Sequence, residues 1–189
     1  KKIMFKDFRD NPKKNALNTP SGKIEITSNI IKNYNLKDCK GHPTWIEPYE
    51  WLGRKENFPL HLISNQPEYR LHGQLDNAEY SLKNKIKDRE PVLINIEDAK
   101  ERNIENNDVV LIFNKRGRVL AGARLSDEIM RGVLVLSTGA WFDPDYEINT
   151  DLHGNPNVLT KDIGTSQLSQ APTSHTCLVE IRKAKKNEI

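Results

Sequence analysis

Apolar residues gather in short runs in the second part of the chain. From Phe58 onward, Val, Ile and Leu occupy segments of six to nine residues that are separated by turn-forming residues. Runs of this length and composition are typical of strands rather than helices. The pattern predicts six strands, at residues 59–64, 91–96, 108–113, 117–125, 132–137 and 176–182.

The connections between these runs favour a barrel. The segment EDAKERNIENND (97–108) places acidic residues first and basic ones later, which suits a short helix and its dipole. The segment NKRGR (114–118) predicts a hairpin turn in which Gly117 takes a positive φ. Short strands with one small helix and a closing strand at the C-terminal end indicate a mainly β fold closed into a barrel.

The opening stretch, residues 1–57, is irregular and rich in turn residues. Only residues 23–27 (KIEIT) alternate like a strand, and SNIIKNYNL (28–36) predicts a short helix capped by Ser28 or Asn29. We therefore expect two parts, an N-terminal extension at 1–57 and a barrel at 58–189. The aromatic residues Trp45 and Trp51 suggest that the extension lies against a larger body.

Composition narrows the class of function. The 29 basic and 26 acidic residues of the 189-residue chain give a net charge of +3, spread along its length, which does not indicate nucleic-acid binding. The basic tail at 182–189 is expected to be solvated. Cys39 and Cys177 match no metal-ligand spacing, and Cys177 is expected in the core. No apolar run approaches the roughly 18 residues of a membrane helix.

Two long polar segments lie beside the first and last predicted strands, at 64–80 (SNQPEYRLHGQLDNAEY) and 153–172 (HGNPNVLTKDIGTSQLSQAP). If the sheet closes on itself, they meet at one rim. Their amides suit the edge of a flat heterocycle such as guanine, and the GTS sequence suits a phosphate. The candidate binding residues are Ser64, Gln66, Arg70, His72, Gln74, Asn155, Asn157, Thr165, Ser166 and Gln170.

A plain solvated loop is the competing interpretation of both segments, because Asn, Ser, Thr and Gly are ordinary turn formers. The sequence also contains no phosphate-binding P-loop, no HExxH motif and no recognisable Ser-His-Asp set. A hydrolase that uses His153 and Asp151 lacks a nucleophile. The residues alone indicate a binding module without catalytic groups of its own.

A resemblance carried by five motifs in fixed order changes this balance. The segments NTPSGKIEI, GHPTWIEPYEW, PLHLISNQPEYRLHGQLD, the stretch from REPVLINI to GAWFDP, and HGNPNVLTKDIGTSQLSQ run from Asn18 to the last predicted strand. In this order they resemble the C-terminal part of the dimethyl sulfoxide reductase family of molybdopterin oxidoreductases. The similarity is greatest to the trimethylamine-N-oxide and biotin sulfoxide reductase branch.

The resemblance implies a double-psi β-barrel that covers a bis(molybdopterin guanine dinucleotide) cofactor held mainly by earlier domains of the same polypeptide. By position it assigns cofactor contacts to Gln66, Arg70, His72, Gln74, Asn155, Asn157 and Gln170. It also implies that residues 1–57 end the preceding domain, and that the side chain ligating molybdenum lies in that earlier part.

The leading hypothesis is therefore the cofactor-binding part of a molybdenum enzyme that reduces an N-oxide or S-oxide by oxygen-atom transfer. The fragment alone is expected to be inactive and to hold no metal. The alternative is a stand-alone nucleotide- or protein-binding barrel without redox activity. Neither hypothesis chooses between a periplasmic and a cytoplasmic location.

Overall fold

The computed structural model describes residues 2–54 and 57–189. The chain divides into two compact units. One comprises Lys1–Glu47 with Gly164–Ala171, and the other comprises Pro48–Ile163 with Pro172–Ile189. The expected division at residue 57 concerns the domains of a longer protein and stays a prediction.

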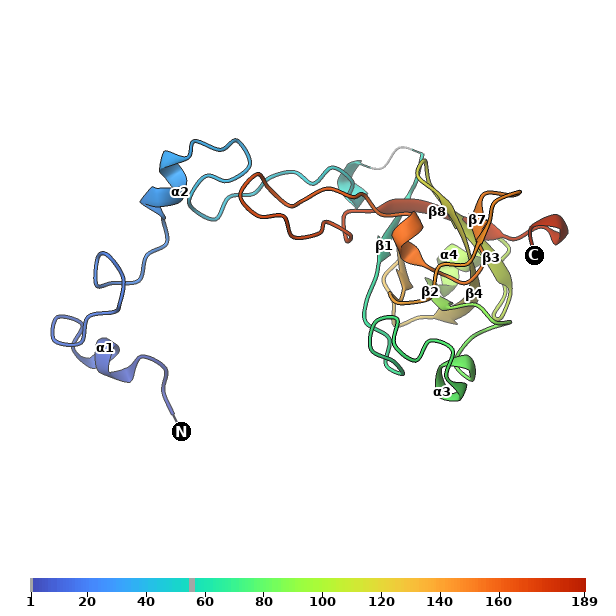
Figure 1. The fold of residues 1–189 in the computed structure, drawn as a ribbon, viewed down its shortest axis with the longest axis horizontal. Coiled ribbons are helices and arrows are strands. Elements are labelled where there is room, and N and C mark those ends of the chain that lie inside the picture. Colours follow the sequence, from blue (N-terminus) through green and yellow to red (C-terminus); the bar gives the residue numbers. More distant parts are fainter. Residues whose placement is uncertain (1, 55–56) are drawn as a thin grey trace. The chain divides into compact units, whose positions relative to one another are not determined.

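A closed barrel forms the body of the larger unit (Figure 1). Its six strands follow the order β2-β5-β1-β8-β3-β4, and a parallel pairing of β2 with β4 closes the ring. The mainly β barrel and its strands are thus confirmed. The strands are β1 (Leu60–Ile63), β2 (Pro91–Asn95), β3 (Val109–Phe113), β4 (Arg118–Ser126), β5 (Val133–Leu136) and β8 (Leu178–Lys183).

Strand directions bring the ends of distant segments together. Strands β1 and β5 are parallel, with Leu62 opposite Leu134, so the residues that follow each strand leave the barrel at the same end. The remaining ring pairings are antiparallel, apart from β2 with β4. Two short strands, β6 (Pro144–Asp145) and β7 (Thr150–Asp151), extend the sheet from β4.

Alternating apolar residues fill the barrel. Leu62, Ile94, Ile112 and Leu134 have no exposed surface, and Cys177 is buried among them as expected. Each such aliphatic side chain contributes about 2 kcal/mol through removal from water. This core is the rigid support on which the polar loops lie.

Helices are short throughout the described residues. The expected helix after β2 is α4 (Ile96–Lys100), which begins where the Asn95 side chain accepts a hydrogen bond from the Glu97 N–H. Ser28 caps α2 (Asn29–Asn33) in the same way, as predicted. The others are α1 (Lys6–Asp10), α3 (Glu79–Leu82) and the 3-10 turns η1 (Leu52–Arg54), η2 (Pro156–Val158) and η3 (Lys186–Glu188).

Three local expectations were wrong. Residues 23–27 form no strand, because an alternating segment needs a neighbouring strand and Ile24 and Ile26 are instead 71% and 75% exposed. The hairpin turn exists, but Gly117 does not take a positive φ. Glycine is required there because a Cβ would lie 2.4 Å from the Val158 carbonyl oxygen. The tail is not fully solvated, since Glu188 is buried against Arg182 and Arg118.

Candidate functional site

The segment that follows β1, residues 64–80, folds back over the end of the barrel. Gln66 Nε2 lies 3.0 Å from His72 Nδ1, and the backbone N–H of His72 donates to Gln66 Oε1 at 3.4 Å. An amide N–H₂ group can only donate, so Nδ1 accepts and Nε2 of His72 carries the proton. Both side chains are exposed. The pair therefore presents a fixed imidazole donor to the outside.

Residues that follow β5 contact this segment directly. The Thr138 N–H donates to the Asn65 carbonyl at 2.9 Å, and Ser137 Oγ donates to Asn65 Oδ1 at 2.9 Å. Gly139 has a φ of +91°, and a Cβ on it would lie 2.0 Å from the His72 carbonyl oxygen. Only glycine permits this approach, so the first polar segment lies directly on the loop after β5. We call these two stretches, residues 64–76 and 137–139, the rim.

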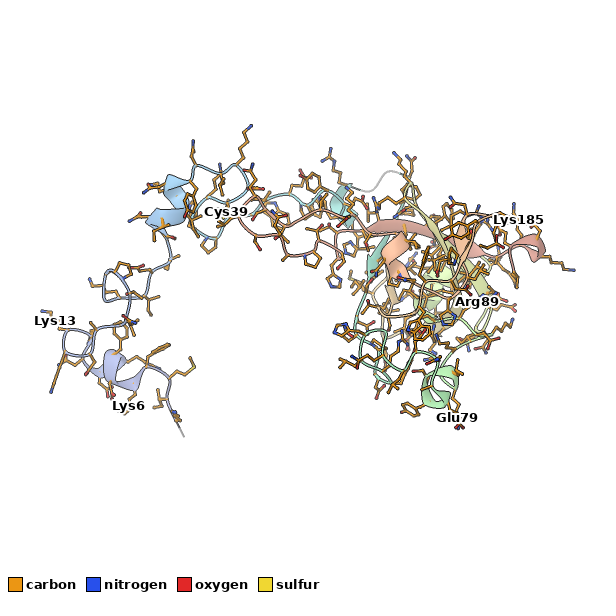
Figure 2. The ribbon with its side chains drawn as sticks, viewed as in Figure 1. Lys6, Lys13, Cys39, Glu79, Arg89 and Lys185 are labelled. Atoms are coloured by element: carbon orange, nitrogen blue, oxygen red, sulfur yellow. The ribbon has the colours of Figure 1, made fainter. Side chains whose placement is uncertain are left out.

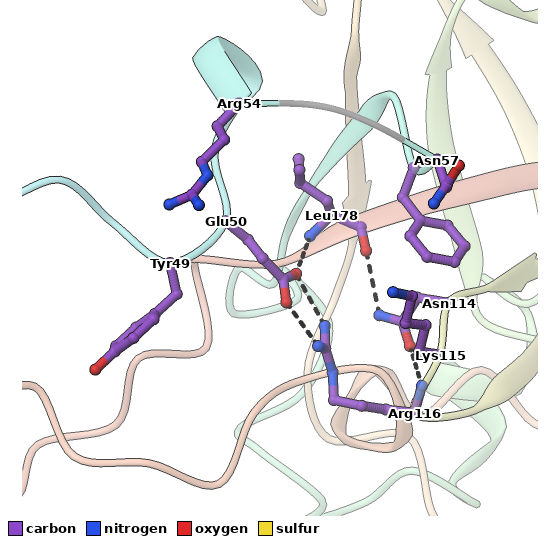
Figure 3. A pocket seen from close by; sticks show the side chains of 9 residues that line it. Tyr49, Glu50, Arg54, Asn57, Asn114, Lys115, Arg116 and Leu178 are labelled. Atoms are coloured by element: carbon purple, nitrogen blue, oxygen red, sulfur yellow. Dashed lines mark hydrogen bonds and ion pairs between the residues drawn. The ribbon is translucent and has the colours of Figure 1, made fainter.

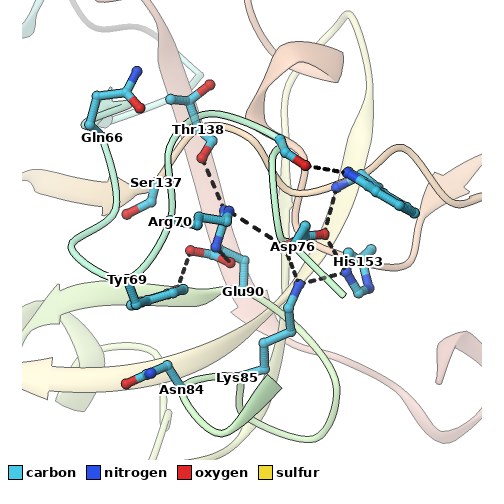
Figure 4. Close-up of polar contacts among 12 residues, drawn as sticks. Gln66, Tyr69, Arg70, Asp76, Asn84, Lys85, Glu90, Ser137, Thr138 and His153 are labelled. Carbon is cyan, nitrogen blue, oxygen red and sulfur yellow. Dashed lines mark hydrogen bonds and ion pairs between the residues drawn. The ribbon is translucent and has the colours of Figure 1, made fainter. Parts of the chain in front are cut away.

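Arg70 lies beneath this rim, and its side chain is fully buried (Figure 4). Nη1 donates to Glu90 Oε2 at 2.9 Å and Nη2 donates to the Thr138 carbonyl at 3.0 Å. Nε donates to the His72 carbonyl at 3.2 Å. The guanidinium thus holds two backbone carbonyls and the Glu90 carboxylate inside the protein, and its Nε also lies 3.4 Å from Asp76 Oδ1.

Glu90 receives a second donor on its other oxygen. The hydroxyl of Tyr69 donates to Glu90 Oε1 at 2.6 Å. Burial, together with this bond and the negative charge of Glu90, raises the pKa of the Tyr69 hydroxyl well above its usual value. Burial opposes the charge of Arg70, but Glu90 outweighs it and raises the pKa of the guanidinium.

A second buried pair links the two polar segments. Lys85 Nζ donates to Asp76 Oδ1 at 2.7 Å, and His153 Nε2 lies 2.6 Å from Lys85 Nζ and 3.0 Å from Asp76 Oδ2. The Trp141 N–H also donates to Asp76 Oδ2. Burial alone raises the pKa of Asp76, but Lys85, the Trp141 N–H and Arg70 together outweigh it and lower that pKa. The two segments thus meet at His153 and Asp76.

The start of the second segment is a tight turn around Asp151. Asp151 Oδ1 accepts the backbone N–H groups of His153, Gly154 and Asn155 at 2.9 to 3.2 Å. The imidazole of His153 contacts Asp76 and Lys85 instead, so no catalytic pair with Asp151 forms. Asn155 Oδ1 accepts the N–H of Asn157 at 3.0 Å and so begins η2.

The remaining candidates lie in the smaller unit, within Gly164–Ala171. Ser166 Oγ accepts the Ser169 N–H, and Gln170 Nε2 donates to the Ser166 carbonyl at 3.3 Å. Thr165 Oγ1 donates to the Ser169 carbonyl at 3.0 Å. These residues form a compact polar loop, in which Thr165 and Gln170 are exposed.

Ser64 and Gln74 complete the predicted set. Ser64 Oγ is buried without a hydrogen-bond partner among the described residues, at the point where β1 ends. The side chain of Gln74 is exposed, and its N–H donates to the Leu71 carbonyl. An unsatisfied buried hydroxyl costs stability unless a partner arrives.

Sequence reasoning missed the buried partners of the site. Asp76, Lys85, Glu90, Thr138 and Trp141 organise the rim, yet none was a candidate. A usable signal was present at Glu90, a carboxylate directly before a buried strand, because a charge in that place requires a buried partner.

A separate pocket of about 320 Å³ lies elsewhere on the larger unit (Figure 3). Glu50 forms its wall, accepting Arg116 at 2.6 and 3.0 Å, the Leu178 N–H at 2.7 Å, and Lys161 at 3.0 Å. Burial opposes the charge of Glu50, but these donors lower its pKa to about 2. The lining residues are Tyr49, Glu50, Arg54, Asn57, Phe58, Asn114, Lys115, Arg116 and Leu178.

Side chains project from all parts of the larger unit (Figure 2). Leu71, Leu75, Trp141 and Phe142 are 52% to 67% exposed, although the Trp141 indole donates to the Gly73 carbonyl. Among residues 2–54 and 57–189, no group of three or more His, Cys, Asp or Glu side chains is placed to hold a metal ion. Within the same residues, no helix is both long and apolar enough to cross a membrane.

Comparison with known proteins identifies the barrel. Residues 60–178 match the family model described as "Molydopterin dinucleotide binding domain". The chain belongs to the molybdopterin dinucleotide binding domain family. The matched span covers the strands from β1 to the start of β8 and both polar segments. The resemblance seen in the motifs is thereby confirmed.

Curated relatives of this molybdopterin dinucleotide binding domain are larger proteins. Trimethylamine-N-oxide reductase of Haemophilus influenzae is 47% identical over 96% of this chain, and trimethylamine-N-oxide reductase 1 of Escherichia coli K12 is 49% identical over 96%. Biotin sulfoxide reductase of Cereibacter sphaeroides is 46% identical over 92%. The chain spans only 22% to 23% of the length of these three relatives.

A solved structure supports the fold independently of sequence. Acetylene hydratase from Pelobacter acetylenicus superposes with a TM-score of 0.71 at 15% identity, over 90% of this chain and 24% of that one. At this identity the similarity shows the barrel architecture of the molybdopterin dinucleotide binding domain.

Proposed function

We propose that the chain is the C-terminal cofactor-binding part of a longer molybdenum oxidoreductase that reduces an N-oxide or S-oxide. One observation carries the proposal: identities of 46% to 49% over at least 92% of the chain to reductases named for such substrates. The other domains of the same polypeptide are then its first partners. The same matches favour this function over a stand-alone binding module.

The residues of the rim fit a molybdopterin dinucleotide. Ser64 Oγ is buried and lacks a partner among the described residues, and the Gln66–His72 pair presents a fixed donor beside it in the chain. Exposed amides suit a guanine edge, whose O6 and N7 accept and whose N2 donates. We therefore assign the cofactor as the guanine form, in the bis(molybdopterin guanine dinucleotide) arrangement.

The contacts are assigned by residue. Gln66, His72 and Gln74 bind through exposed polar side chains of the first segment, and Ser64 binds through its buried hydroxyl. Arg70 acts from beneath, since each of its three guanidinium nitrogens donates a hydrogen bond within the protein. The second segment contributes Asn155, Asn157, Thr165, Ser166 and Gln170.

The cofactor and the residues that bind it have different roles. The bound molybdenum cofactor supplies the two-electron oxygen-atom-transfer chemistry, which side chains do not provide. The chain's own residues hold and orient the dinucleotide by hydrogen bonds and keep the rim fixed. His72 contributes a ring N–H that the Gln66 amide holds in one orientation.

The test uses the longer polypeptide that contains this chain, purified and assayed with reduced viologen as electron donor. We expect reduction of trimethylamine N-oxide, dimethyl sulfoxide or biotin sulfoxide. We also expect release of guanosine monophosphate on acid hydrolysis, at two molecules per molybdenum. A protein that reduces none of these oxides and releases no guanine nucleotide refutes the proposal.

A further inference from the structure

We propose that Glu90 is a positioning residue for the molybdopterin dinucleotide, acting through Arg70 on the rim that binds it. The inference rests on the function proposed above and deepens it. Glu90 itself is fully buried and is not a contact residue. Its role is to fix the backbone on which the Gln66–His72 pair is mounted.

The side chain of Glu90 ties the barrel wall to the first polar segment. It directly precedes β2, and its two oxygens accept from Arg70 Nη1 at 2.9 Å and from the Tyr69 hydroxyl at 2.6 Å. Figure 4 shows both donors converging on the carboxylate from the same loop. One rigid strand end therefore anchors two consecutive residues of the rim segment.

Arg70 in turn fixes the backbone at His72 and Thr138. Its remaining donors hold the carbonyls of His72 and Thr138, at 3.2 and 3.0 Å. His72 has a φ of 50°, a conformation that costs free energy outside glycine and persists only when neighbours hold it. The guanidinium of Arg70 stabilises this conformation through the His72 carbonyl and thereby orients the imidazole.

The backbone of Glu90 ties down the second segment as well. Its N–H donates to the His153 carbonyl at 3.1 Å, and its carbonyl accepts the Gly122 N–H of β4 at 3.0 Å. A Cβ on Gly154 would lie 2.4 Å from Glu90 Cβ, so the second segment packs directly on this residue. Glu90 thus joins both polar segments and two barrel strands.

The charges explain why a buried network occupies this place. Arg70 and Lys85 are balanced by Glu90 and Asp76, all with side chains at most 1% exposed. Buried ion pairs of this kind contribute little net stability compared with apolar packing, but they fix one geometry strongly. Holding the rim in the geometry that binds the dinucleotide accounts for the free-energy cost of burying these four charges.

The test compares Glu90→Gln, which keeps the shape and removes the charge, with Glu180→Gln, which breaks the Arg102–Glu180 pair at 2.7 Å elsewhere on the barrel. Amide hydrogen exchange is measured on the chain at His72, Gln74 and Thr138, and at Leu62 as a core reference. We expect exchange at the three rim amides about tenfold faster in Glu90→Gln, unchanged at Leu62, and unchanged throughout in Glu180→Gln. A general loss of stability would accelerate Leu62 too.

Arg70→Lys provides a second variant if Glu90→Gln does not fold. Lysine keeps the charge opposite Glu90, but one ammonium cannot hold the carbonyls of His72 and Thr138 together. The same local increase in exchange is expected. Unchanged exchange at the rim, or an increase that includes Leu62 equally, overturns the inference.

Molybdenum per polypeptide in the longer protein supplies the second readout. We expect Glu90→Gln to lose at least half of the wild-type content while Glu180→Gln retains it. Rapid rim exchange with full molybdenum content overturns the positioning role and leaves the proposed function intact. A wild-type protein that binds no molybdopterin overturns the proposed function itself.

Discussion

Gln66 and His72 form a single unit, with the amide Nε2 of one 3.0 Å from the ring Nδ1 of the other. The amide fixes which imidazole nitrogen carries the proton, and the exposed Nε2–H is then a donor of known direction. A flexible imidazole has to be ordered when a ligand binds, whereas this one is ordered in advance.

Removing the amide should release the imidazole. In Gln66→Ala we expect both neutral tautomers of His72, whereas the wild-type chain should show only the form protonated at Nε2. Nitrogen-15 NMR of the imidazole ring measures this directly. Identical ring spectra for the two proteins would show that Gln66 does not control His72.

Gly139 should tolerate a side chain far less well than Gly132. Both have a positive φ, +91° and +80°, so alanine strains the backbone similarly at each, by about 1 kcal/mol. At Gly139 a Cβ also meets the His72 carbonyl oxygen at 2.0 Å, whereas at Gly132 the nearest atoms lie 3.8 Å away. Urea unfolding should show a loss at least about 2 kcal/mol greater for Gly139→Ala. Equal losses would disprove the close packing of these loops.

Low pH should destabilise the barrel because it protonates Glu50. Its donors lower the pKa to about 2 from 4.5, so the carboxylate is protonated more easily in the unfolded chain. The stability contributed by its ionised form is therefore complete above pH 4.5 and is lost as the pH falls toward 2. Glu188 follows the same direction, with a pKa of about 2.

Glu50→Gln should consequently cost about 2 kcal/mol at pH 7 and reduce the acid dependence. Unfolding free energies measured from pH 7 to pH 2 test this. The difference between variant and wild type should narrow as the pH falls below 4.5. A constant difference across that range would contradict the ion-paired Glu50.

The two cysteines should react differently with thiol reagents. Cys177 is fully buried, and burial raises the pKa of its thiol to about 11, despite the nearby Arg116. Cys39 is partly exposed. Because the thiolate is the reactive form, native protein should label once, at Cys39, and denatured protein twice. Labelling of native Cys177 at a comparable rate would contradict the core packing.

The sequence predicted the barrel well because its signal is local. Each of the six runs is short and apolar, contains β-branched residues and lies between turn-forming residues, which together indicate a strand. The segment at 23–27 shows the limit of this signal, because Ile24 and Ile26 alternate correctly but find no sheet edge in the described structure.

The candidate site was less accessible from sequence because its organisation is non-local. Glu90 lies 20 residues from Arg70, and His153 lies 77 residues from Asp76. Nothing in residue spacing indicates that these charges are buried together, and only the closed barrel brings them to one end. Gly117 likewise looked like a turn glycine, whereas its lack of a side chain serves the approach of Val158.

Cofactor content tests the central claim, that the two polar segments hold the dinucleotide. The longer polypeptide should be purified as wild type, as Asn155→Ala, as Gln170→Ala and as the control Glu180→Gln, and molybdenum per polypeptide measured by mass spectrometry. We predict full content in wild type and control, and reduced content in both Asn155→Ala and Gln170→Ala. Equal molybdenum content in all four proteins would contradict the account.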